Sequence, residues 1–538
     1  MGSIASDIGS QTDYAFTIYR GTFIQSVLPD SGSKPELSRN QGALWVSAVD
    51  GRIHGWDWKA SDESGFAELM SRNGWVDIDA IEAQAQANGH VSKTKVKIVT
   101  ANEEQNEFFF PGFIDTHIHA PQYPNAGLFG SSTLLDWLET YTFPVESRFG
   151  SPPDPKTGHQ TQTNPKETPL LAQQIYDQVI SRTLSHGTTC ASYYATNHVP
   201  ATNALSTLCH TRGQRAFIGR ACMDNPDFCV DYYRDFSADD SVIATRQTIE
   251  FIHTLDPEGK LVKPIITPRF APSCTRPALQ SLGELAASYS PPLYIQTHIS
   301  ENINELALVK ELFPEADSYA DVYDKYNLLT PRTILAHAVH LSPDERALIR
   351  TREAKISHCP ASNSALGSGI CPVRTLLDEG ITVGLGTDVS GGYSPSILEA
   401  ARQACLVSRL LGQSAAWQRD HPQADGREKL SVQESLYLAT RGGAAVVDMG
   451  SDLGGFDMGM LWDVQLIRLG GVKFVEKSPL DGVPGDGSAD LVQAGPVGNV
   501  DLFGTETWEE KIQKWVWSGD DRNVKAVWVG GRLVHSRV

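Results

Sequence analysis

The chain of 538 residues has a hydrophobic fraction of 41% and carries 45 Lys and Arg against 64 Asp and Glu, a formal net charge of −19. The apolar fraction is sufficient for a large buried core, and the acidic balance argues against nucleic acids and anionic membranes as partners, because both select clusters of Lys and Arg. Eight cysteines without regular spacing do not form a disulfide framework and fit a reducing compartment.

The N-terminal end of the chain shows no export or membrane signal. No apolar run reaches the roughly 18–20 residues of a membrane span, and no basic segment precedes an apolar one. The opening residues, MGSIAS, fit the N-myristoylation pattern, but one acyl chain without a polybasic neighbour anchors only weakly. We therefore expect a free cytoplasmic chain and leave acylation of Gly2 open.

Both ends of the chain are rich in short apolar runs of the kind that form strands. Alternating runs such as AFTIYRGTFIQSV and VKAVWVGGRLV, punctuated by glycine, lie in residues 1–110 and 441–538. We expect these two segments to form one small β-sandwich-like domain. The segments 149–168 and 471–499 are rich in Gly, Pro and polar residues and predict exposed insertions.

Residues 111–440 alternate short apolar runs with amphipathic segments. Eight apolar runs end in polar residues: FFFPGFIDTHIH, GTTCASYYAT, QRAFIGRACMD, KPIITPRFAPS, PLYIQTHISEN, TILAHAVHLS, AKISHCPASN and TVGLGTDVSGG. The segments between them have helical spacing of apolar residues, at 169–186, 241–255, 275–289, 302–312, 342–352 and 372–379. Within NINE, Asn302 and Glu305 have the form of a helix capping box. Eight strand–helix units in succession predict an α/β fold of the (β/α)8, TIM-type barrel class.

Histidine and aspartate residues stand at the ends of four of these strands. His117 and His119 close the first run, and they face the same side because alternate residues of a strand point the same way. His298, His337 and Asp388 close the fifth, sixth and eighth runs. In a (β/α)8 barrel these strand ends meet at one mouth. Imidazole and carboxylate donors together suit Zn²⁺ or Fe²⁺, with an open position for water.

Each of these residues also has an ordinary structural explanation. A single His-x-His is more often a strand pair than a pair of metal ligands. Asp388 could cap the following helix, and His337 could be a core histidine with satisfied hydrogen bonds. A metal site is favoured because all four strand ends carry such residues together.

Six motifs in a fixed order give the chain a family resemblance. They are PGFIDTHIHAPQY, TPRF, HISEN, AHAVHLS, HCPASN and GLGTDVSGGY. Together they resemble the amidohydrolase superfamily and, within it, the guanine deaminase family. The resemblance extends to YTFPVESRF, VYDKYNLLT and SGDDRNVKAVWVGGRLV. It therefore covers nearly the whole chain apart from the N-terminal region and the two insertions.

The resemblance implies one divalent metal ion in each chain. In the mononuclear deaminases of this superfamily, the ligands match His117, His119, His298 and Asp388. Binuclear relatives carry a carboxylated lysine at the end of strand four, where this chain has Arg269. We therefore expect a single metal, with Zn²⁺ first and Fe²⁺ as the alternative, since the same ligands suit both.

The resemblance also assigns the proton transfers of a hydrolytic deamination. Glu301, three residues after His298, matches the proton shuttle of the family, although alone it could be a first-turn carboxylate favoured by the helix dipole. Asp388 is implied to accept the proton of the attacking water while it binds the metal. His337 is implied to orient the hydroxide without being a ligand.

Substrate recognition is assigned to three residues at matching positions of the family. Gln122 offers an amide to a purine edge, Arg269 a guanidinium to a ring carbonyl, and Phe270 a ring that stacks on the base. Without the resemblance they could equally be a loop glutamine, a salt-bridged arginine and a core phenylalanine. With it, we expect a small purine base as the partner, and hydrolysis of guanine to xanthine and ammonia as the reaction.

Two other functions stay open. A related amidohydrolase could deaminate 8-oxoguanine, a pterin or a triazine, and a panel of substrates would distinguish it. A non-catalytic scaffold on the same fold would be expected to lose metal ligands, whereas this chain keeps every ligand position and Glu301. Because the family is typically dimeric, we expect a homodimer, with no nucleic-acid or membrane partner.

Overall fold

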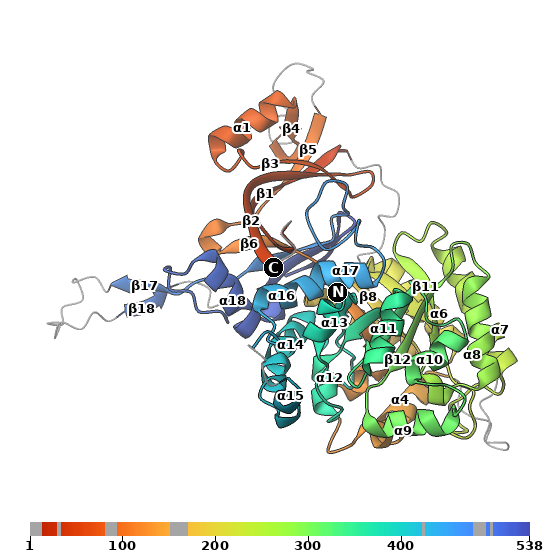
Figure 1. Cartoon of the computed structure of the whole chain (residues 1–538). Helices are drawn as coiled ribbons and strands as arrows, with labels where there is room; N and C mark the ends of the chain where they lie inside the picture. Colours follow the sequence, from red (N-terminus) through yellow and green to blue (C-terminus); the bar gives the residue numbers. More distant parts are fainter. Residues whose placement is uncertain are drawn as a thin grey trace.

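The computed structural model describes residues 13–29, 34–80, 94–150, 170–421, 426–476, 491–494 and 499–537. In this part of the chain a barrel of parallel strands with surrounding helices lies beside a sheet that is built from both chain ends (Figure 1). Gly2 and nearly all of the predicted insertion 149–168 lie outside the described residues, as does much of 471–499. Among the described helices, none combines the length and the apolar character needed to cross a membrane.

Eight parallel strands form the barrel. Seven of them lie within the predicted runs, and the fourth begins one residue before its run, at Val262. In order of pairing they are β7 (Phe113–His119), β8 (Thr188–Tyr194), β9 (Arg215–Gly219), β11 (Val262–Pro268), β12 (Tyr294–Ile299), β13 (Thr333–His337), β14 (Lys355–His358) and β15 (Val383–Leu385). The short β10 (Ala221–Cys222) adds to β11. Sequential pairing of parallel strands is what strand–helix repeats produce, so the predicted barrel is confirmed.

Hydrogen bonds at the mouth draw the first and the eighth strand together. The backbone N–H of Asp388 donates to the carbonyl oxygen of His117 at 2.8 Å. One layer of side chains deeper in the barrel, the Asp115 carboxylate accepts from the backbone N–H of Thr387 at 3.0 Å and from the Thr387 hydroxyl at 2.5 Å. The barrel is therefore nearly closed, and the ends of its first and last strands are fixed relative to each other.

Helices follow the strands where the spacing of apolar residues predicts them. Five of the six predicted segments contain α5 (Leu170–Ser185), α8 (Arg276–Ala287), α9 (Ile303–Leu312), α11 (Pro343–Thr351) and α13 (Val373–Asp378). The sixth helix, α7 (Ala238–Leu255), begins three residues before its predicted segment 241–255. The capping box before α9 is present, with the Glu305 carboxylate accepting from the Asn302 N–H at 3.1 Å. Further helices are α6 (Val199–Arg212), α10 (Tyr319–Lys325), α12 (Pro360–Ala365), α14 (Ile397–Leu411), α15 (Ala415–Asp420), α16 (Val432–Tyr437) and α17 (Gly443–Val446).

The second sheet confirms that both chain ends build one β-rich unit. Its path runs through β20 (Arg532–Ser536), β19 (Val524–Val529), β16 (Val464–Arg468), β6 (Glu107–Pro111), β1 (Phe16–Val27), β2 (Glu36–Ser47) and β3 (Ile53–Asp57). β5 (Thr94–Thr100) pairs with β1, and β4 (Trp75–Asp77) pairs with β5. The N-terminal strands, red to orange, thus lie beside the blue C-terminal strands (Figure 1). The remaining elements include α1 (Glu63–Arg72), α18 (Trp508–Ser518), and the separate pair β17 (Lys473–Glu476) and β18 (Leu491–Ala494).

A buried ion pair joins this sheet to the barrel. The Nε and Nη2 atoms of Arg215, at the start of β9, each lie 3.1 Å from an oxygen of Asp463, just before β16. The side chains are only 5% and 2% exposed. Asp463 also accepts from the backbone N–H of Gly530 at 2.7 Å. The pair is therefore shielded from water and supported by a further hydrogen bond.

Replacing Asp463 by Asn is expected to destabilise the fold, because it leaves the Arg215 guanidinium buried without its counter-charge. We expect the free energy of unfolding to fall by about 3 kcal/mol, measured by urea denaturation. Asp177→Asn is the matched control, since Asp177 also pairs with an arginine, Arg212, but the two side chains are 40% and 45% exposed. Its effect should stay under about 1 kcal/mol. Equal effects of the two substitutions would contradict the structural role of the buried pair.

Candidate active site

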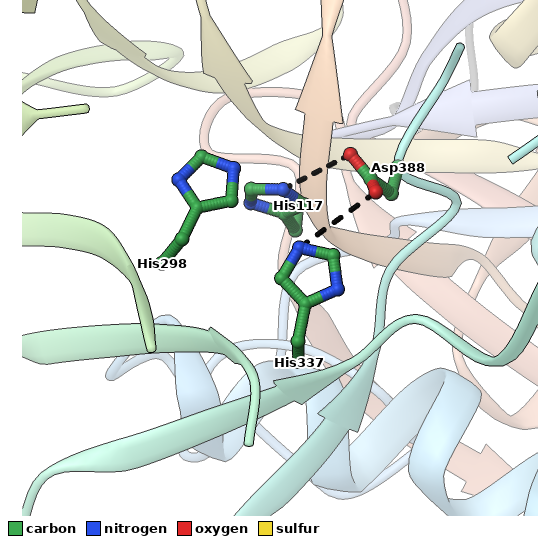
Figure 2. Close-up of side chains that lie close together, drawn as sticks. All are labelled: His117, His298, His337 and Asp388. Carbon is green, nitrogen blue, oxygen red and sulfur yellow. Dashed lines mark ion pairs between the residues drawn. The ribbon is translucent and has the colours of Figure 1, made fainter. Parts of the chain in front are cut away.

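Four predicted site residues converge at the mouth of the barrel. His117, His298 and His337 project from β7, β12 and β13, and Asp388 follows β15 (Figure 2). Each offers one donor atom, and these four atoms lie within 4.8 Å of one another. The Nε2 atom of His117 is 3.2 Å from Oδ1 of Asp388, and Nε2 of His337 is 3.7 Å from Oδ2. Residues up to 271 positions apart thus share one small volume.

The fifth predicted residue, His119, lies at the rim of this group. Its Nε2 atom is 3.1 Å from Nε2 of His298 and 3.5 Å from Oδ1 of Asp388. The compact set of four donor atoms contains His337, which the resemblance puts beside the metal, and does not contain His119. All five side chains nevertheless surround the same point.

The chemistry of these donor atoms fits a divalent cation. Nε2 of His117, Nδ1 of His119 and Nε2 of His337 are buried without a hydrogen-bond partner. The Nδ1 atom of His298 contacts the carbonyl oxygen of Arg269 at 2.5 Å, which leaves its Nε2 as the nitrogen with a lone pair for a metal. Unsatisfied buried nitrogens next to a carboxylate are donors that would fit a Zn²⁺ or Fe²⁺ ion.

Burial sets the protonation states of the cluster. Burial lowers the pKa of His117, His119 and His298. Neighbouring imidazoles lower the pKa of His119 and His298 further. These three rings are therefore favoured in the neutral form, with free lone pairs. Burial alone would raise the pKa of Asp388, but the surrounding histidines, His117 first, hold it well below its usual range. The cluster therefore combines neutral imidazoles with an ionised carboxylate, the forms that bind metal.

The backbone around the cluster is strained. Ser300, His337, Ala338 and Asp388 have φ values of 50°, 74°, 52° and 47°, in the left-handed region that non-glycine residues rarely adopt. Such a conformation costs roughly 1–3 kcal/mol per residue. Its concentration directly after β12, β13 and β15 indicates that these strand ends are shaped for the position of their side chains rather than for stability.

Glu301 is buried next to the cluster and is held at both oxygens. Its Oε1 accepts from the Ser368 hydroxyl at 3.0 Å, and its Oε2 lies 3.4 Å from Nε2 of His337. The Glu301 backbone N–H donates to the Glu305 carboxylate at 2.8 Å. Burial raises the pKa of Glu301 to about 7. The nearby Asp388 also raises this pKa, whereas His337 lowers it. Such a carboxyl exchanges protons readily near neutral pH.

The pKa of His337 is shifted in the opposite direction to that of the other histidines. Burial alone would lower its pKa, but the carboxylates of Glu301 and Asp388 outweigh burial and raise it. Its Nδ1 contacts Oδ1 of Asn363 at 2.9 Å, which orients the ring with Nε2 toward Glu301 and Asp388.

A pocket opens directly onto this cluster. Its lining includes the three predicted recognition residues Gln122, Arg269 and Phe270, together with His119, His298, His337, Glu301 and Asp388. Apolar side chains close the other side: Leu134, Trp137, Leu138 and Leu366. The Phe270 ring stands edge-on to Phe228 at 5.1 Å. One cavity thus brings every predicted site residue except His117 to its wall.

Glu146 lies next to the site but was not predicted there, although its segment YTFPVESRF is part of the family resemblance. Its carboxylate, fully buried, lies 2.7 Å from Nη1 and 3.2 Å from Nη2 of Arg269 and accepts from Nε2 of Gln122 at 2.8 Å. Burial alone would lower the pKa of Arg269, but Glu146 raises it. Glu146 ends the short helix α4 (Phe143–Glu146), and its partners lie 24 and 123 positions away, so local spacing gives no signal for it.

Ser368 and Glu305 also reach the site without having been predicted there. Ser368 lies in an irregular segment after α12 and touches Glu301 only in the folded chain. The sequence pattern predicts Glu305 correctly as a helix cap, but not its second bond to the Glu301 backbone. Both residues fix the conformation of Glu301.

Comparison with known proteins places this site in a family. The model of the amidohydrolase family matches residues 108–534. A probable guanine deaminase of Schizosaccharomyces pombe is 48% identical over 428 residues, covering 80% of this chain and 71% of that protein. The guanine deaminase of Dictyostelium discoideum is 40% identical over 475 residues, covering 85% and 92%. The human guanine deaminase is 37% identical over 429 residues, covering 80% and 83%.

Solved structures agree with this assignment. A crystal structure of guanine deaminase from C. acetobutylicum, with bound guanine in the active site, superposes with a TM-score of 0.71 and 28% identity, over 97% of this chain and 100% of that one. The predicted resemblance is thereby confirmed: the chain belongs to the amidohydrolase family and, within it, to the guanine deaminases.

Proposed function

We propose that this chain catalyses the hydrolytic deamination of guanine to xanthine and ammonia, with one bound divalent metal ion. The observation that carries the proposal is the shared pocket. A carboxyl with a pKa of about 7, a histidine and aspartate cluster, and the arginine, glutamine and phenylalanine expected for base recognition all line it. The identities of 37–48% to guanine deaminases of several species support the choice of substrate.

We assign the metal to His117, His119, His298 and Asp388, with Zn²⁺ ahead of Fe²⁺. Bound in such a site, the ion acts as a Lewis acid and lowers the pKa of water towards about 7, so that hydroxide is available at neutral pH. His298 is prepared for this role, because the Arg269 carbonyl engages its Nδ1 and leaves Nε2 to bind. His337, next to both carboxylates, orients the attacking oxygen.

Proton transfer falls to the two buried carboxyl groups. The attack of water on C2 of guanine requires that the water lose a proton and that an adjacent ring nitrogen gain one. Asp388, ionised in the cluster, is placed to accept the first. Glu301 delivers the second, since its pKa near 7 lets it donate and be recharged at neutral pH. The proton that Asp388 takes from water then passes to the departing amine, which leaves as NH₃ because NH₂⁻ is too basic to leave, and the proton of the remaining hydroxyl returns to Glu301 as the carbonyl of xanthine forms.

Base recognition is assigned to Gln122, Arg269 and Phe270. The N–H groups of Arg269 that do not face Glu146 are free to donate to a ring carbonyl, and Phe270 can stack on the base. Adenine lacks that carbonyl, and a pyrimidine leaves part of the pocket empty. Guanine presents both the carbonyl and the amino group.

A homodimer is also part of the proposal and rests on the family resemblance, whereas the cytoplasmic location rests on the irregular cysteine spacing and the lack of a signal pattern. Light scattering coupled to size-exclusion chromatography would give the number of chains in the particle.

Substitution of Glu301 by Gln is expected to lower kcat for guanine by about 10²- to 10⁴-fold, because the amide cannot transfer the proton. Xanthine formation, followed by absorbance, measures the loss, and the bound metal should remain. Glu311→Gln, an exposed glutamate on α9, the helix that follows Glu301, is the matched control and should keep full activity. Full activity of the Glu301 variant would remove this residue from the mechanism.

Deamination of 8-oxoguanine, a pterin and a triazine in the same assay tests the substrate. We expect guanine to have the highest kcat/KM. A protein that binds metal but turns over another of these heterocycles faster would be a related amidohydrolase instead.

Metal analysis tests the ligand set. We expect one Zn²⁺ or Fe²⁺ in each wild-type chain, measured by mass spectrometry of the digested protein. His298→Ala should lose most of it, because one nitrogen donor disappears and the remaining donors coordinate the ion incompletely. His253→Ala, at an exposed position, should keep the full content. Equal metal content in both variants would exclude His298 as a ligand.

A further inference from the structure

We propose that Glu146 is a positioning residue that determines which bases this enzyme accepts, by fixing the hydrogen-bonding direction of both Gln122 and Arg269. The inference rests on the proposed function, because it concerns recognition of the carbonyl edge of the substrate. It goes beyond that function by assigning specificity to a residue that does not line the pocket.

The Glu146 carboxylate lies behind the recognition residues. It is 0% exposed, and it bridges the Arg269 guanidinium, through two N–H groups, and the Gln122 amide, through one. Gln122 and Arg269 are among the described residues that line the pocket, whereas Glu146 is not. Glu146 therefore acts on the substrate only through these two side chains.

Glu146 decides which way the Gln122 amide points. An ionised carboxylate only accepts hydrogen bonds, so the NH₂ group of Gln122 must face it. On the other side, Oε1 of Gln122 accepts from the backbone N–H of Ser390 at 3.2 Å. A flipped amide would place Oε1 of Gln122 against the Glu146 carboxylate and its NH₂ group against the Ser390 N–H, and both hydrogen bonds would be lost. Gln122 therefore presents a fixed donor and a fixed acceptor to the pocket.

Glu146 also holds the Arg269 guanidinium in place. The ion pair keeps a buried cation compensated, and the Phe143 ring lies 5.5 Å from its Cζ atom. With two N–H groups directed at Glu146, the remaining ones are fixed in direction, and a guanidinium has no acceptor to offer. The pocket therefore selects a base with a carbonyl oxygen at this position, because a group that is itself a donor, or no group at all, would leave buried N–H groups unpaired.

Loss of Glu146 should therefore weaken recognition of the carbonyl rather than the chemistry at C2. The appropriate pair of substrates is guanine and 2-aminopurine, which carry the same C2 amino group and differ at the C6 carbonyl and the adjacent N1–H. For Glu146→Gln we expect kcat/KM for guanine to fall by about 10- to 100-fold, mainly through KM, as for a lost hydrogen bond to a charged group. For 2-aminopurine the change should stay within about threefold, since it has no carbonyl to lose contact with.

The experiment measures kcat and KM for both bases with the metal-loaded wild type, Glu146→Gln and Glu146→Asp. Glu107→Gln is the matched control, because Glu107 is equally buried and paired with Arg468 and Lys525 but lies in the other sheet. The ratio of kcat/KM for guanine to that for 2-aminopurine should fall at least about threefold in the Glu146 variants and stay unchanged in the control.

An unchanged ratio in folded Glu146 variants, with equal losses on both bases, would make the residue merely structural and overturn the inference. Should Glu146→Gln fail to fold, Glu146→Asp decides by the same ratio, because it retains the charge and shortens the side chain by one methylene. A wild type that leaves guanine unchanged would overturn the proposed function and this inference together, whereas an active wild type with an unchanged ratio in the variants overturns this inference alone.

Discussion

The position of the site depends on the buried carboxylate of Asp115, which fixes the end of the last strand against the first. Asp115 lies on the same face of β7 as His117 and His119, one layer deeper, and its oxygens accept from the N–H and hydroxyl of Thr387. Burial raises the pKa of Asp115 to about 7, against the lowering effect of the Thr387 hydrogen bonds. Because Asp388 follows Thr387 directly, this contact and the bond from its N–H to the His117 carbonyl bring the two ends of the barrel sequence together at one point.

The same closure concentrates polar groups where water is scarce. Buried imidazoles with unsatisfied nitrogens, a carboxylate between them and residues with positive φ all cost stability. The surrounding protein compensates with bonds from outside the cluster, such as Asn363 to His337 and Ser368 to Glu301. These bonds hold the reactive groups in one arrangement before any substrate arrives, which is the form of preorganisation on which electrostatic catalysis depends.

The sequence predicts the barrel well because its signals are local. A strand that is buried on both sides is a short apolar run, and a covering helix repeats its apolar residues with a helical period, so each element is recognisable without its neighbours. The polar residues at the strand ends become a site only through the parallel topology, which the strand–helix alternation already implies.

Contacts between distant loops were not predictable in this way. Glu146 ends a helix of four residues next to a π-helical turn at 138–142, where no period can establish itself. Ser368 reaches Glu301 across 67 positions from an irregular segment. In each case a polar residue in a loop looks the same in sequence whether it faces solvent or a buried partner. Burial of Glu146 and Ser368 is decided by packing of the loops above the strands, and a linear pattern does not encode that packing.

Arg269 connects the two halves of the site. Its backbone carbonyl engages Nδ1 of His298 at 2.5 Å, while its guanidinium pairs with Glu146 at the recognition end of the pocket. A single residue after β11 therefore orients a predicted metal ligand with its main chain and carries, on its side chain, the guanidinium that we propose for base recognition. Since the peptide backbone is stiff, a displacement of this strand end would disturb both at once. The orientation of His298 and the position of the guanidinium are thus coupled through one residue, whose side chain is held by the Glu146 carboxylate and lies 5.5 Å from the Phe143 ring.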